Sequence, residues 1–257
     1  MERDRILLWE ACRNVRDLGG YRTPAGRTRW GALVRADSLG QLTPAGQSSL
    51  IAYGIRTVID IRFPEEAPRD PNPFADQSGG ADAPAYLNIP VNSGRDPAMD
   101  AALMAARGSA VSVSREEANR FELDVNPVGY ARIVAAVAVT EPGGVVVHCH
   151  AGRGRTGIAI ALMLALVGVA YDDIAGHYGL SAPSADEAYA RWLATQAHVN
   201  ALEAEMLRRQ SIASPQVMLR TLEHLENRYG GAEAYLWGAG LTREAIETLQ
   251  TRLVEIR

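Results

Sequence analysis

The sequence predicts an α/β fold with a central, mostly parallel sheet of about four to five strands flanked by helices. Short apolar runs without alternation are typical of strands buried on both faces. Helix patterns lie between and after these runs, and such alternation is characteristic of α/β proteins. The chain has 257 residues and a hydrophobic fraction of 47%, and no repeat or linker divides it. We therefore expect a single domain over residues 1–257.

Four expected strands share a short, continuous apolar stretch. They are residues 32–34, 57–61, 86–91 and 145–148. Two helices are expected between them. Thr43-Pro44 opens the first, which ends near Gly54, because threonine is a good N-cap and proline fits the first helical turn. Residues 127–139 form the second, which leads into a Glu-Pro-Gly-Gly turn.

Beyond residue 148 the sequence is mostly helical. A long apolar helix is expected from about Arg155. Residues 185–209 are expected to form one helix whose apolar stripe packs in the core, and the stripe consists of Trp192, Val199, Leu202 and Met206. A further helix starts at Ser214-Pro215 and closes at Gly230-Gly231, and the last begins after Thr242, its N-cap.

Two segments interrupt the alternation. Residues 64–84 contain five prolines and a Gly-Gly pair, which predicts a surface loop. Residues 92–126 hold two short helix-like segments, at 99–107 and 115–123. Insertions of this length near a site often act as lids, so we expect either a helical lid insertion or a plain surface excursion.

Composition excludes several functions. The net charge is −4, and all 26 basic residues are arginine, a balance that does not favour a nucleic-acid partner. The two cysteines are too few for a disulfide framework and suit a reducing compartment, so we expect a cytoplasmic location. The N-terminus does not resemble a signal peptide, although export by another route stays open. The longest apolar stretch, residues 158–170, is too short to span a bilayer.

Residues 148–157, HCHAGRGRTG, carry the strongest functional signal. Cys149 follows an apolar strand, Arg155 lies six positions later, and glycines separate the two. Glycines let a loop curl so that its N–H groups point inward, and the following helix directs its positive end to the same place. This arrangement supplies a nucleophile, a ring of N–H groups and a fixed cation around one phosphate group.

The chemistry requires an ionised thiol. An ordinary cysteine has a pKa near 8.5, so only about 3% is thiolate at pH 7. Lowering the pKa to about 5 takes roughly 5 kcal/mol, which the loop N–H groups, the helix, Arg155 and the Thr156 hydroxyl can supply. A thiolate would form a phosphocysteine that water hydrolyses, with no metal or cofactor. The expected phosphate-binding residues are His150, Ala151, Gly152, Arg153, Gly154, Arg155 and Thr156.

The two histidines of the loop have different expected roles. His148 is expected to orient the loop from beneath. His150 either faces substrate or contributes only its backbone. Alternate histidines without further ligands make a poor zinc site, so we expect no metal here.

These residues resemble the signature of cysteine-dependent protein tyrosine and dual-specificity phosphatases, His-Cys-x5-Arg-Thr/Ser. The wider chain is similar to the bacterial phosphatases of the mycobacterial tyrosine phosphatase B type, through residues 14–21 (NVRDLGGY), 58–62 (VIDIR) with Glu66, and 229–236. The resemblance covers nearly the whole chain and implies the fold of that family. It also implies activity on phosphotyrosine, phosphoserine or phosphothreonine, and phosphoinositides.

One departure from the group affects substrate choice. The group usually shows Lys-Asp before the arginine of the loop, and Arg153-Gly154 stands here. Gly154 removes a carboxylate that could act as an acid. The resulting string resembles the loop of phosphatase-and-tensin-type lipid phosphatases, which favours a highly phosphorylated or inositol-based substrate.

A general acid should protonate the leaving oxygen. We expect Asp60, near the carboxyl end of an apolar strand, because its counterpart in the resembling group is a candidate acid. Asp96 is the second candidate. Alternatively, Asp60 is a structural carboxylate that pairs with Arg16, Arg62 or a loop N–H.

Other residues have more modest expectations. Arg16 and Asp17 either contact substrate at the rim or pin the N-terminal segment by pairing. Cys12 is expected to be an inert buried thiol, with a regulatory disulfide to Cys149 as the alternative.

We therefore expect a metal-independent phosphatase that acts on phosphoproteins or phosphoinositides, with Cys149 as nucleophile, Arg155 as phosphate clamp and Asp60 as acid. The alternatives are an inositol-phosphate or lipid phosphatase with little protein activity, a sulfur- or arsenate-transfer enzyme, and an inactive phosphate-binding module. The physiological substrate and the oligomeric state do not follow from the sequence.

Overall fold

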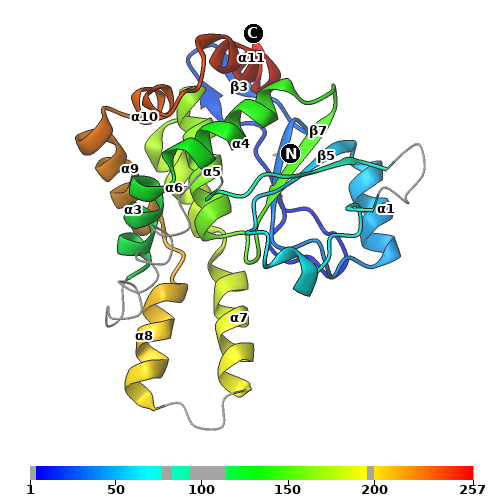
Figure 1. Cartoon of the computed structure of the whole chain (residues 1–257), viewed down its shortest axis with the longest axis vertical. Helices are drawn as coiled ribbons and strands as arrows, with labels where there is room; N and C mark the ends of the chain where they lie inside the picture. Colours follow the sequence, from blue (N-terminus) through cyan, green and yellow to red (C-terminus); the bar gives the residue numbers. More distant parts are fainter. Residues whose placement is uncertain (1–3, 77–82, 93–113, 196–199, 257) are drawn as a thin grey trace.

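The central sheet of this protein has five strands. A computed structural model describes residues 4–76, 83–92, 114–195 and 200–256 (Figure 1). The strand order is β1-β4-β7-β5-β6, and all neighbours are parallel except β1 and β4. Their bounds are β1 (Arg16–Asp17), β4 (Leu33–Ala36), β5 (Ile55–Asp60), β6 (Ala85–Asn88) and β7 (Gly144–His148). The predicted α/β class with a mostly parallel sheet is confirmed.

The register brings three carboxyl ends of strands together. His148 at the end of β7 lies beside Ala36 of β4 on one side and Asp60 of β5 on the other. Because ligands bind beyond the carboxyl ends of parallel strands, the chain segments that follow these residues meet where a site is expected.

A second, small antiparallel sheet was not predicted. It consists of β2 (Arg22–Thr23), β3 (Gly26–Thr28) and β8 (Val254–Ile256), in that order. Strands of two or three residues give no readable period, and β8 joins β3 from the opposite end of the chain. This sheet ties the C-terminal segment to the N-terminal one.

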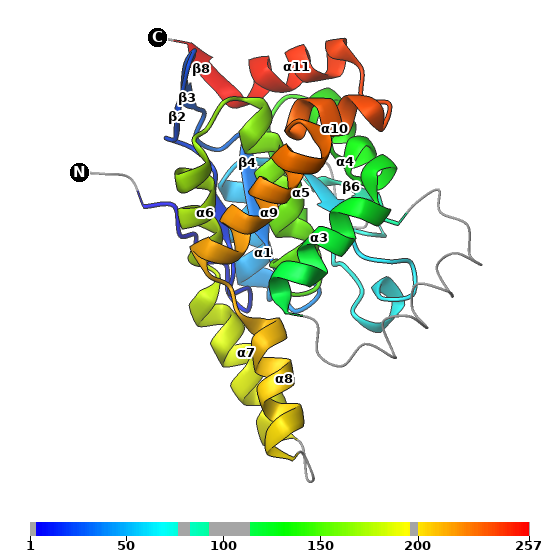
Figure 2. The same cartoon turned by 90° about the vertical axis from the view of Figure 1, so that its left-hand side faces the viewer.

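Helices surround the central sheet on both faces (Figures 1 and 2). The predicted N-caps Thr43 and Thr242 are confirmed, since each accepts a hydrogen bond from a first-turn N–H. Ser214, at the predicted start of another helix, does the same. The helices are α1 (Pro44–Ala52), η1 (Ala67–Arg69), α3 (Arg115–Val125), α4 (Pro127–Val139), α5 (Gly154–Leu166), α6 (Tyr171–Gly179), α7 (Ala182–Ala194), α8 (Ala201–Ser211), α9 (Pro215–Tyr229), α10 (Ala232–Gly238) and α11 (Arg243–Leu253).

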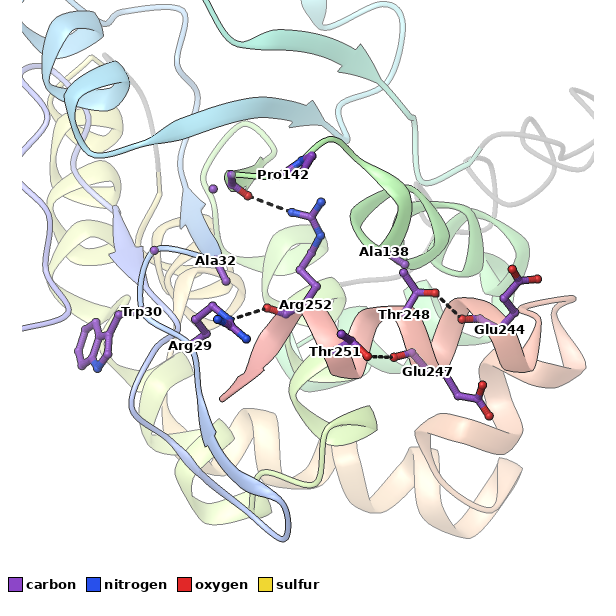
Figure 3. A pocket seen from close by; sticks show the side chains of 13 residues that line it. Arg29, Trp30, Ala32, Ala138, Pro142, Glu244, Glu247, Thr248, Thr251 and Arg252 are labelled. Atoms are coloured by element: carbon purple, nitrogen blue, oxygen red, sulfur yellow. Dashed lines mark hydrogen bonds between the residues drawn. The ribbon is translucent and has the colours of Figure 1, made fainter. Parts of the chain in front are cut away.

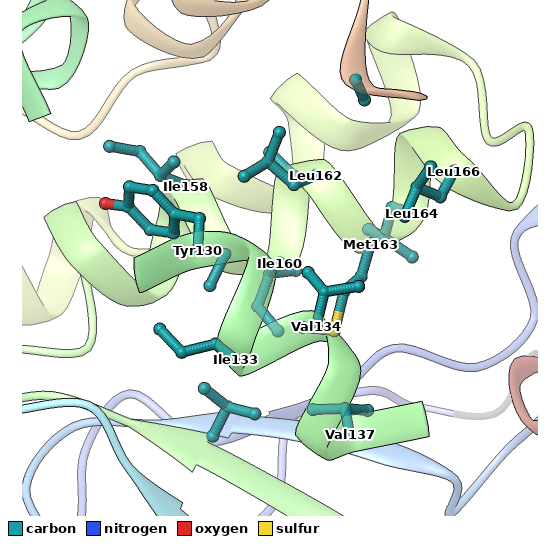
Figure 4. Packing of buried hydrophobic residues seen from close by; sticks show 14 of the residues in the cluster. Tyr130, Ile133, Val134, Val137, Ile158, Ile160, Leu162, Met163, Leu164 and Leu166 are labelled. Carbon is teal, nitrogen blue, oxygen red and sulfur yellow. The ribbon is translucent and has the colours of Figure 1, made fainter. Parts of the chain in front are cut away.

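Most buried apolar side chains belong to a cluster built around α4 and α5 (Figure 4). Ile133, Val134 and Val137 of α4 and Ile160 and Met163 of α5 are each at most 1% exposed. A smaller cluster includes Trp9, Leu39 and Leu50. The helix that follows the cysteine loop is therefore held in the main core, and its N-terminus is fixed in place.

The expectation of one helix over residues 185–209 is wrong. The structure has two helices here, α7 and α8, which lie side by side and extend away from the sheet (Figures 1 and 2). The sequence between Thr195 and Asn200 contains neither glycine nor proline, so no stop signal marked the break. Trp192 is only half-buried, and Val199 and the side chains of Leu202 and Met206 lie outside the described residues.

The two irregular segments are described in part. Of the insertion 92–126, the segment 99–107 lies outside the described residues. The segment 115–123 forms most of α3, and Ser114 and Glu117 form a capping box at the N-terminus of this helix. Buried Leu123 and Asn119 anchor α3, and Asn119 Nδ2 donates to Thr221 Oγ1 of α9 at 3.3 Å. Of residues 64–84, the described portion is mostly irregular and contains η1.

One cavity lies at the opposite end of the sheet. It has a volume of about 700 Å³ and is lined by residues that precede β4 and β7 and by α11 (Figure 3). Arg252 points its guanidinium at backbone carbonyls, including that of Gly143 at 2.9 Å. Neither cysteine nor histidine occurs among the described residues of its lining.

Candidate active site

The cysteine loop connects β7 to α5. Cys149 follows the last residue of β7, and α5 begins at Gly154. All seven residues expected to bind phosphate lie in this loop or in the first turn of α5. Cys149 is 2% exposed and lines a cavity of about 230 Å³. The other lining residues are Glu66, Arg115, Ala118, Glu122, His150, Ala151, Arg153, Gly154 and Arg155.

Hydrogen bonds from outside the loop hold its carbonyl groups. Asn14 Nδ2 donates to the carbonyls of Ala151 and Gly152, each at 3.1 Å, and Arg35 also donates to the Gly152 carbonyl. Because successive peptide carbonyls are turned outward, the N–H groups between them face the cavity. Such a concave ring of N–H groups binds anions.

Gly152 is required by the shape of this loop. Its φ is +60°, and a Cβ there would lie 2.4 Å from the Ala36 carbonyl oxygen at the end of β4. Gly157 has a different reason, since a Cβ would lie 2.7 Å from the ring of Tyr178. The first glycine permits the curl, and the second lets α5 pack closely on α6.

The environment of Cys149 favours its thiolate. Burial alone would raise the pKa of this thiol, but the Arg155 charge, the Thr156 hydroxyl and the N–H groups of Thr156 and Gly152 outweigh it, and the pKa lies below its ordinary value. Within the described residues the Thr156 hydroxyl has no other hydrogen-bond partner, so its proton is available to the Cys149 sulfur. Cys149 and Cys12 are both free thiols in this structure, and a regulatory disulfide between them stays a prediction from the sequence.

Arg155 is held in a fork-to-fork ion pair. Its two terminal nitrogens donate to the two carboxylate oxygens of Glu66, one of them at 2.8 Å. Its guanidinium also stacks 4.5 Å over the Phe63 ring, and the Phe63 N–H donates to Glu66 at 2.8 Å. Paired and stacked, Arg155 is pre-organised beside the thiolate, as planar recognition of phosphate requires.

His148 and His150 differ in surroundings. The His148 ring is fully buried, with Nε2 3.0 Å from Asn72 Nδ2 and Nδ1 3.1 Å from the Cys149 carbonyl. Burial lowers the pKa of His148, so it is neutral and sits beneath the loop. His150 is exposed and lines the cavity, and its carbonyl accepts the Ser38 N–H at 2.8 Å.

Asp60 has no exposed surface and is bound on several sides. Its carboxylate forms an ion pair with Arg62 at 2.7 Å and accepts the Tyr86 hydroxyl at 2.9 Å. Although burial opposes ionisation, the hydrogen bonds from Arg62 and its positive charge outweigh this effect and lower the pKa of Asp60. These contacts favour the structural alternative, and a role as general acid stays a prediction from the sequence. Asp96 lies outside the described residues.

Arg16 and Asp17 are both buried, and neither lines the cavity that contains Cys149. Arg16 donates to Asn14 and to Ser181 Oγ, the latter at 2.8 Å, and Asp17 accepts the Tyr53 hydroxyl at 2.6 Å. These contacts favour the alternative in which Arg16 and Asp17 hold the N-terminal segment in place by pairing. Cys12 is buried and donates to Asp37, and burial together with the Asp37 charge raises its pKa.

Two guanidinium groups lie buried beneath the loop. Arg35 is 1% exposed and Arg16 is 3% exposed, and within the described ranges neither forms an ion pair with a carboxylate. Burial and the charge of Arg35 lower the pKa of Arg16 to about 8, and burial lowers the pKa of Arg35 to about 10, opposed by groups that include Cys149. Their positive charge therefore faces the underside of the thiolate loop.

The sequence alone did not identify Asn14, Arg35 or Glu122 as parts of this site. Asn14 stood in a segment that carried the family resemblance, without a role. Arg35 ends an apolar strand, and a charged residue at that place was the available signal. Glu66 was noted only within the resemblance, and its pairing with Arg155 follows from the fold.

A comparison with protein-family models finds that the model of the tyrosine phosphatase family matches residues 7–255. The chain belongs to the tyrosine phosphatase family. The resemblance of the chain to tyrosine phosphatases is thus confirmed at the level of the family. None of the described helices of this phosphatase is long and apolar enough to span a membrane.

Curated relatives carry the family name. The chain is 33% identical to a protein of Cupriavidus necator whose name assigns it as a tyrosine-protein phosphatase, over 67% of this chain and 61% of that protein. It is 29% identical to a tyrosine-protein phosphatase of Nostoc commune, over 86% and 74% of the two chains. It is 30% identical to triple specificity protein phosphatase PtpB of Mycobacterium tuberculosis, over 69% and 70%. The match thus spans less than two thirds of the Cupriavidus protein's length.

Proposed function

We propose that this chain hydrolyses phosphate monoesters, with phosphotyrosine as its first substrate class, through a phosphocysteine intermediate. The observation that carries the proposal is the joint position of Cys149, Arg155 and the start of α5 around one small cavity. A thiolate, a bidentate cation and inward-facing N–H groups together match the three non-bridging oxygens of a phosphate group.

The proposed reaction has two steps. The Cys149 sulfur attacks phosphorus, the bond from phosphorus to the ester oxygen breaks, and the alcohol or phenol leaves with a proton from an acid. Water then attacks the phosphocysteine, the S–P bond breaks, and inorganic phosphate and the thiolate are regenerated. Arg155 and the loop N–H groups hold the phosphoryl oxygens throughout, where charge builds up in both transition states.

A wider substrate range is supported by the basic groups around the cavity. Arg115 and Arg153 line it together with Arg155, and with Gly154 the loop itself carries no carboxylate. The relative from Mycobacterium tuberculosis is named a triple specificity phosphatase. We propose phosphoserine, phosphothreonine and phosphoinositides as further substrates, with a preference for inositol phosphates as the alternative to protein activity.

The proposal is tested by phosphate release from a phosphotyrosine peptide, a phosphothreonine peptide, a phosphoinositide and an inositol phosphate, compared by kcat/KM. We expect release without added metal and with EDTA present. Rapid acid quenching during turnover should trap phosphate on Cys149. Sulfur transfer from thiosulfate without ester hydrolysis would favour the rival transfer enzyme, and tight phosphate binding without turnover would favour an inactive module.

Gly152→Ala should lower kcat/KM by about 100-fold, because a displacement of the loop by about 1 Å suffices for such a loss. The added methyl group collides with the Ala36 carbonyl, and alanine is strained at a φ of +60°. Gly154→Ala is the matched control, since its Cβ would approach only the end of the Arg115 side chain, at 3.2 Å, and it should retain activity within about threefold. Equal effects of the two changes would contradict this explanation of the loop.

A further inference from the structure

The proposed reaction lacks a proton donor among the residues so far assigned. Of the two carboxylates already described beside Cys149 or Arg155, Asp60 has no exposed surface, so a leaving group cannot reach it. Glu66 binds both terminal nitrogens of Arg155 with its two oxygens. Hydrogen bonds from Arg155 and Phe63 lower the pKa of Glu66 against the effect of burial. A poor leaving group needs another acid.

We propose that Glu122 is the general acid of this site, an inference that rests on the proposed function. Glu122 lines the same cavity as Cys149. It lies on α3 in register with Arg115 and Ala118, which also line this cavity. Positions i, i+3 and i+7 of a helix share one face. α3 therefore directs one face toward the thiolate. Among the described residues of α3 that line the cavity, Glu122 is the only carboxylate.

Contacts on α3 fix the place of the carboxyl group. Asn126 is 2% exposed, and its Nδ2 donates to Glu122 Oε2 at 2.8 Å. The neighbouring Leu123 is 1% exposed in the main core, so the backbone at Glu122 cannot shift freely. An amide N–H can donate to the carbonyl oxygen of a neutral carboxyl group, so this contact is compatible with a proton on Oε1.

Electrostatic surroundings place Glu122 close to the phosphate clamp. In its carboxylate form, which the proposed reaction produces in each turnover, Glu122 is one of the groups that raise the pKa of Arg155, and it also raises the pKa of Tyr130 and Tyr235 in the adjoining core. The ionisable groups that face Glu122 come from its own helix, the loop, α5, the segment after β5, and helices α4 and α10. They are Arg115, Cys149, His150, Arg153, Arg155, Glu66, Tyr130 and Tyr235.

The proton balance closes over one turnover. As the bond from phosphorus to the ester oxygen breaks, Glu122 gives its proton to the leaving oxygen and becomes a carboxylate. In the second step the carboxylate takes a proton from the water that attacks phosphorus, and the S–P bond breaks. The thiolate and the protonated Glu122 are restored, and phosphate leaves.

The test compares two esters in the full-length protein. Glu122→Gln should lower kcat/KM for phenyl phosphate by about 10²–10³-fold, within the usual range for loss of a general acid. For p-nitrophenyl phosphate the loss should stay below about tenfold, because nitrophenolate is a weak base and leaves without a proton. The descending limb of the phenyl phosphate profile at high pH should disappear, since it reports the deprotonation of the acid.

Two further variants separate catalysis from structure. Glu116→Gln is the matched control, because Glu116 lies on the same helix but pairs with Arg120 at 2.6 Å, and it should leave both esters unaffected. Glu122→Ala should regain activity on phenyl phosphate when acetate or formate is added, which a merely structural role would not produce.

The possible results are distinct. Equal losses for the two esters in Glu122→Gln, or an unchanged pH profile, would overturn the assignment of the acid while the proposed function stands. A wild-type protein that hydrolyses neither ester would overturn the proposed function and this inference with it. The leaving-group dependence together with acetate rescue would establish Glu122 as the acid.

Discussion

Cys149→Ser is expected to reduce kcat for phosphate monoesters on the order of 10⁴-fold or more, as loss of a covalent nucleophile does in other enzymes. The surroundings that lower the pKa of Cys149 cannot ionise a serine hydroxyl near neutral pH, because its starting pKa is far higher. Arg155 and the loop N–H groups stay in place, so the affinity for a phosphotyrosine peptide should remain within about threefold of wild type. Initial rates and calorimetric Kd values measure the two effects.

Cys12→Ser provides the comparison. Cys12 Sγ donates to Asp37 Oδ1, and a serine hydroxyl can make the same bond, so activity should stay close to wild type. Alkylation of the wild-type protein by iodoacetate should select Cys149 over Cys12 at pH 7, because the pKa of Cys149 is lowered and that of Cys12 is raised. Retention of a tenth of the activity in Cys149→Ser would contradict the nucleophile assignment.

Asp60→Ala should lower the free energy of unfolding by about 3–5 kcal/mol, the usual cost of removing one partner from a buried ion pair. Both side chains of the Asp60–Arg62 pair have no exposed surface, so the variant leaves a buried guanidinium with less compensation. Urea denaturation at pH 7 measures the loss. Asp70→Ala is the control, because Arg62 retains its ion pair with Asp60 in this variant. The free energy of unfolding should then fall by only about 1 kcal/mol.

The pH dependence of this effect has a definite sign. The pKa of Asp60 in the folded protein lies below its ordinary value, so its contribution to stability is complete above the ordinary carboxyl pKa. That contribution is lost as the pH falls through the lowered value. The difference between wild type and Asp60→Ala should therefore shrink in acid. A stable Asp60→Asn variant with a selective loss on poor leaving groups would instead support the acid role predicted from the sequence.

Local signals determined much of what the sequence could predict about the fold. The helix over residues 127–139 has the expected bounds, because both ends carry local signals. A proline marks its start, and a Pro-Gly-Gly turn follows its end. Strands β4, β5 and β7 were recognisable because each overlaps a short apolar run and is largely buried. The expectation of burial is wrong for β6, which lies at the edge of the sheet and is mostly exposed. By contrast, β8 pairs with β3 across more than 220 residues, and no local pattern announces such a contact.

Within the site, the division follows sequence distance. The loop from Cys149 to Arg155 is one contiguous motif, so its position was predictable. Glu66 and Arg155 are 89 residues apart, and only the fold brings them together. Glu122 lies in an insertion expected to be either a lid or a surface excursion, and its place beside Cys149 depends on the packing of α3 against α5 and α9. Pairing partners in three dimensions were therefore the part that sequence patterns could not supply.

Arg16 and Arg35 have a consequence for the protein as a whole. Two like charges buried close together destabilise the folded chain, and a bound dianion above them is the counter-charge that relieves the repulsion. Ligand occupancy and folding are then thermodynamically linked, and a ligand at 100 times its Kd adds about 2.7 kcal/mol to the unfolding free energy. We therefore expect inorganic phosphate, the product of the proposed reaction, to protect the chain against unfolding.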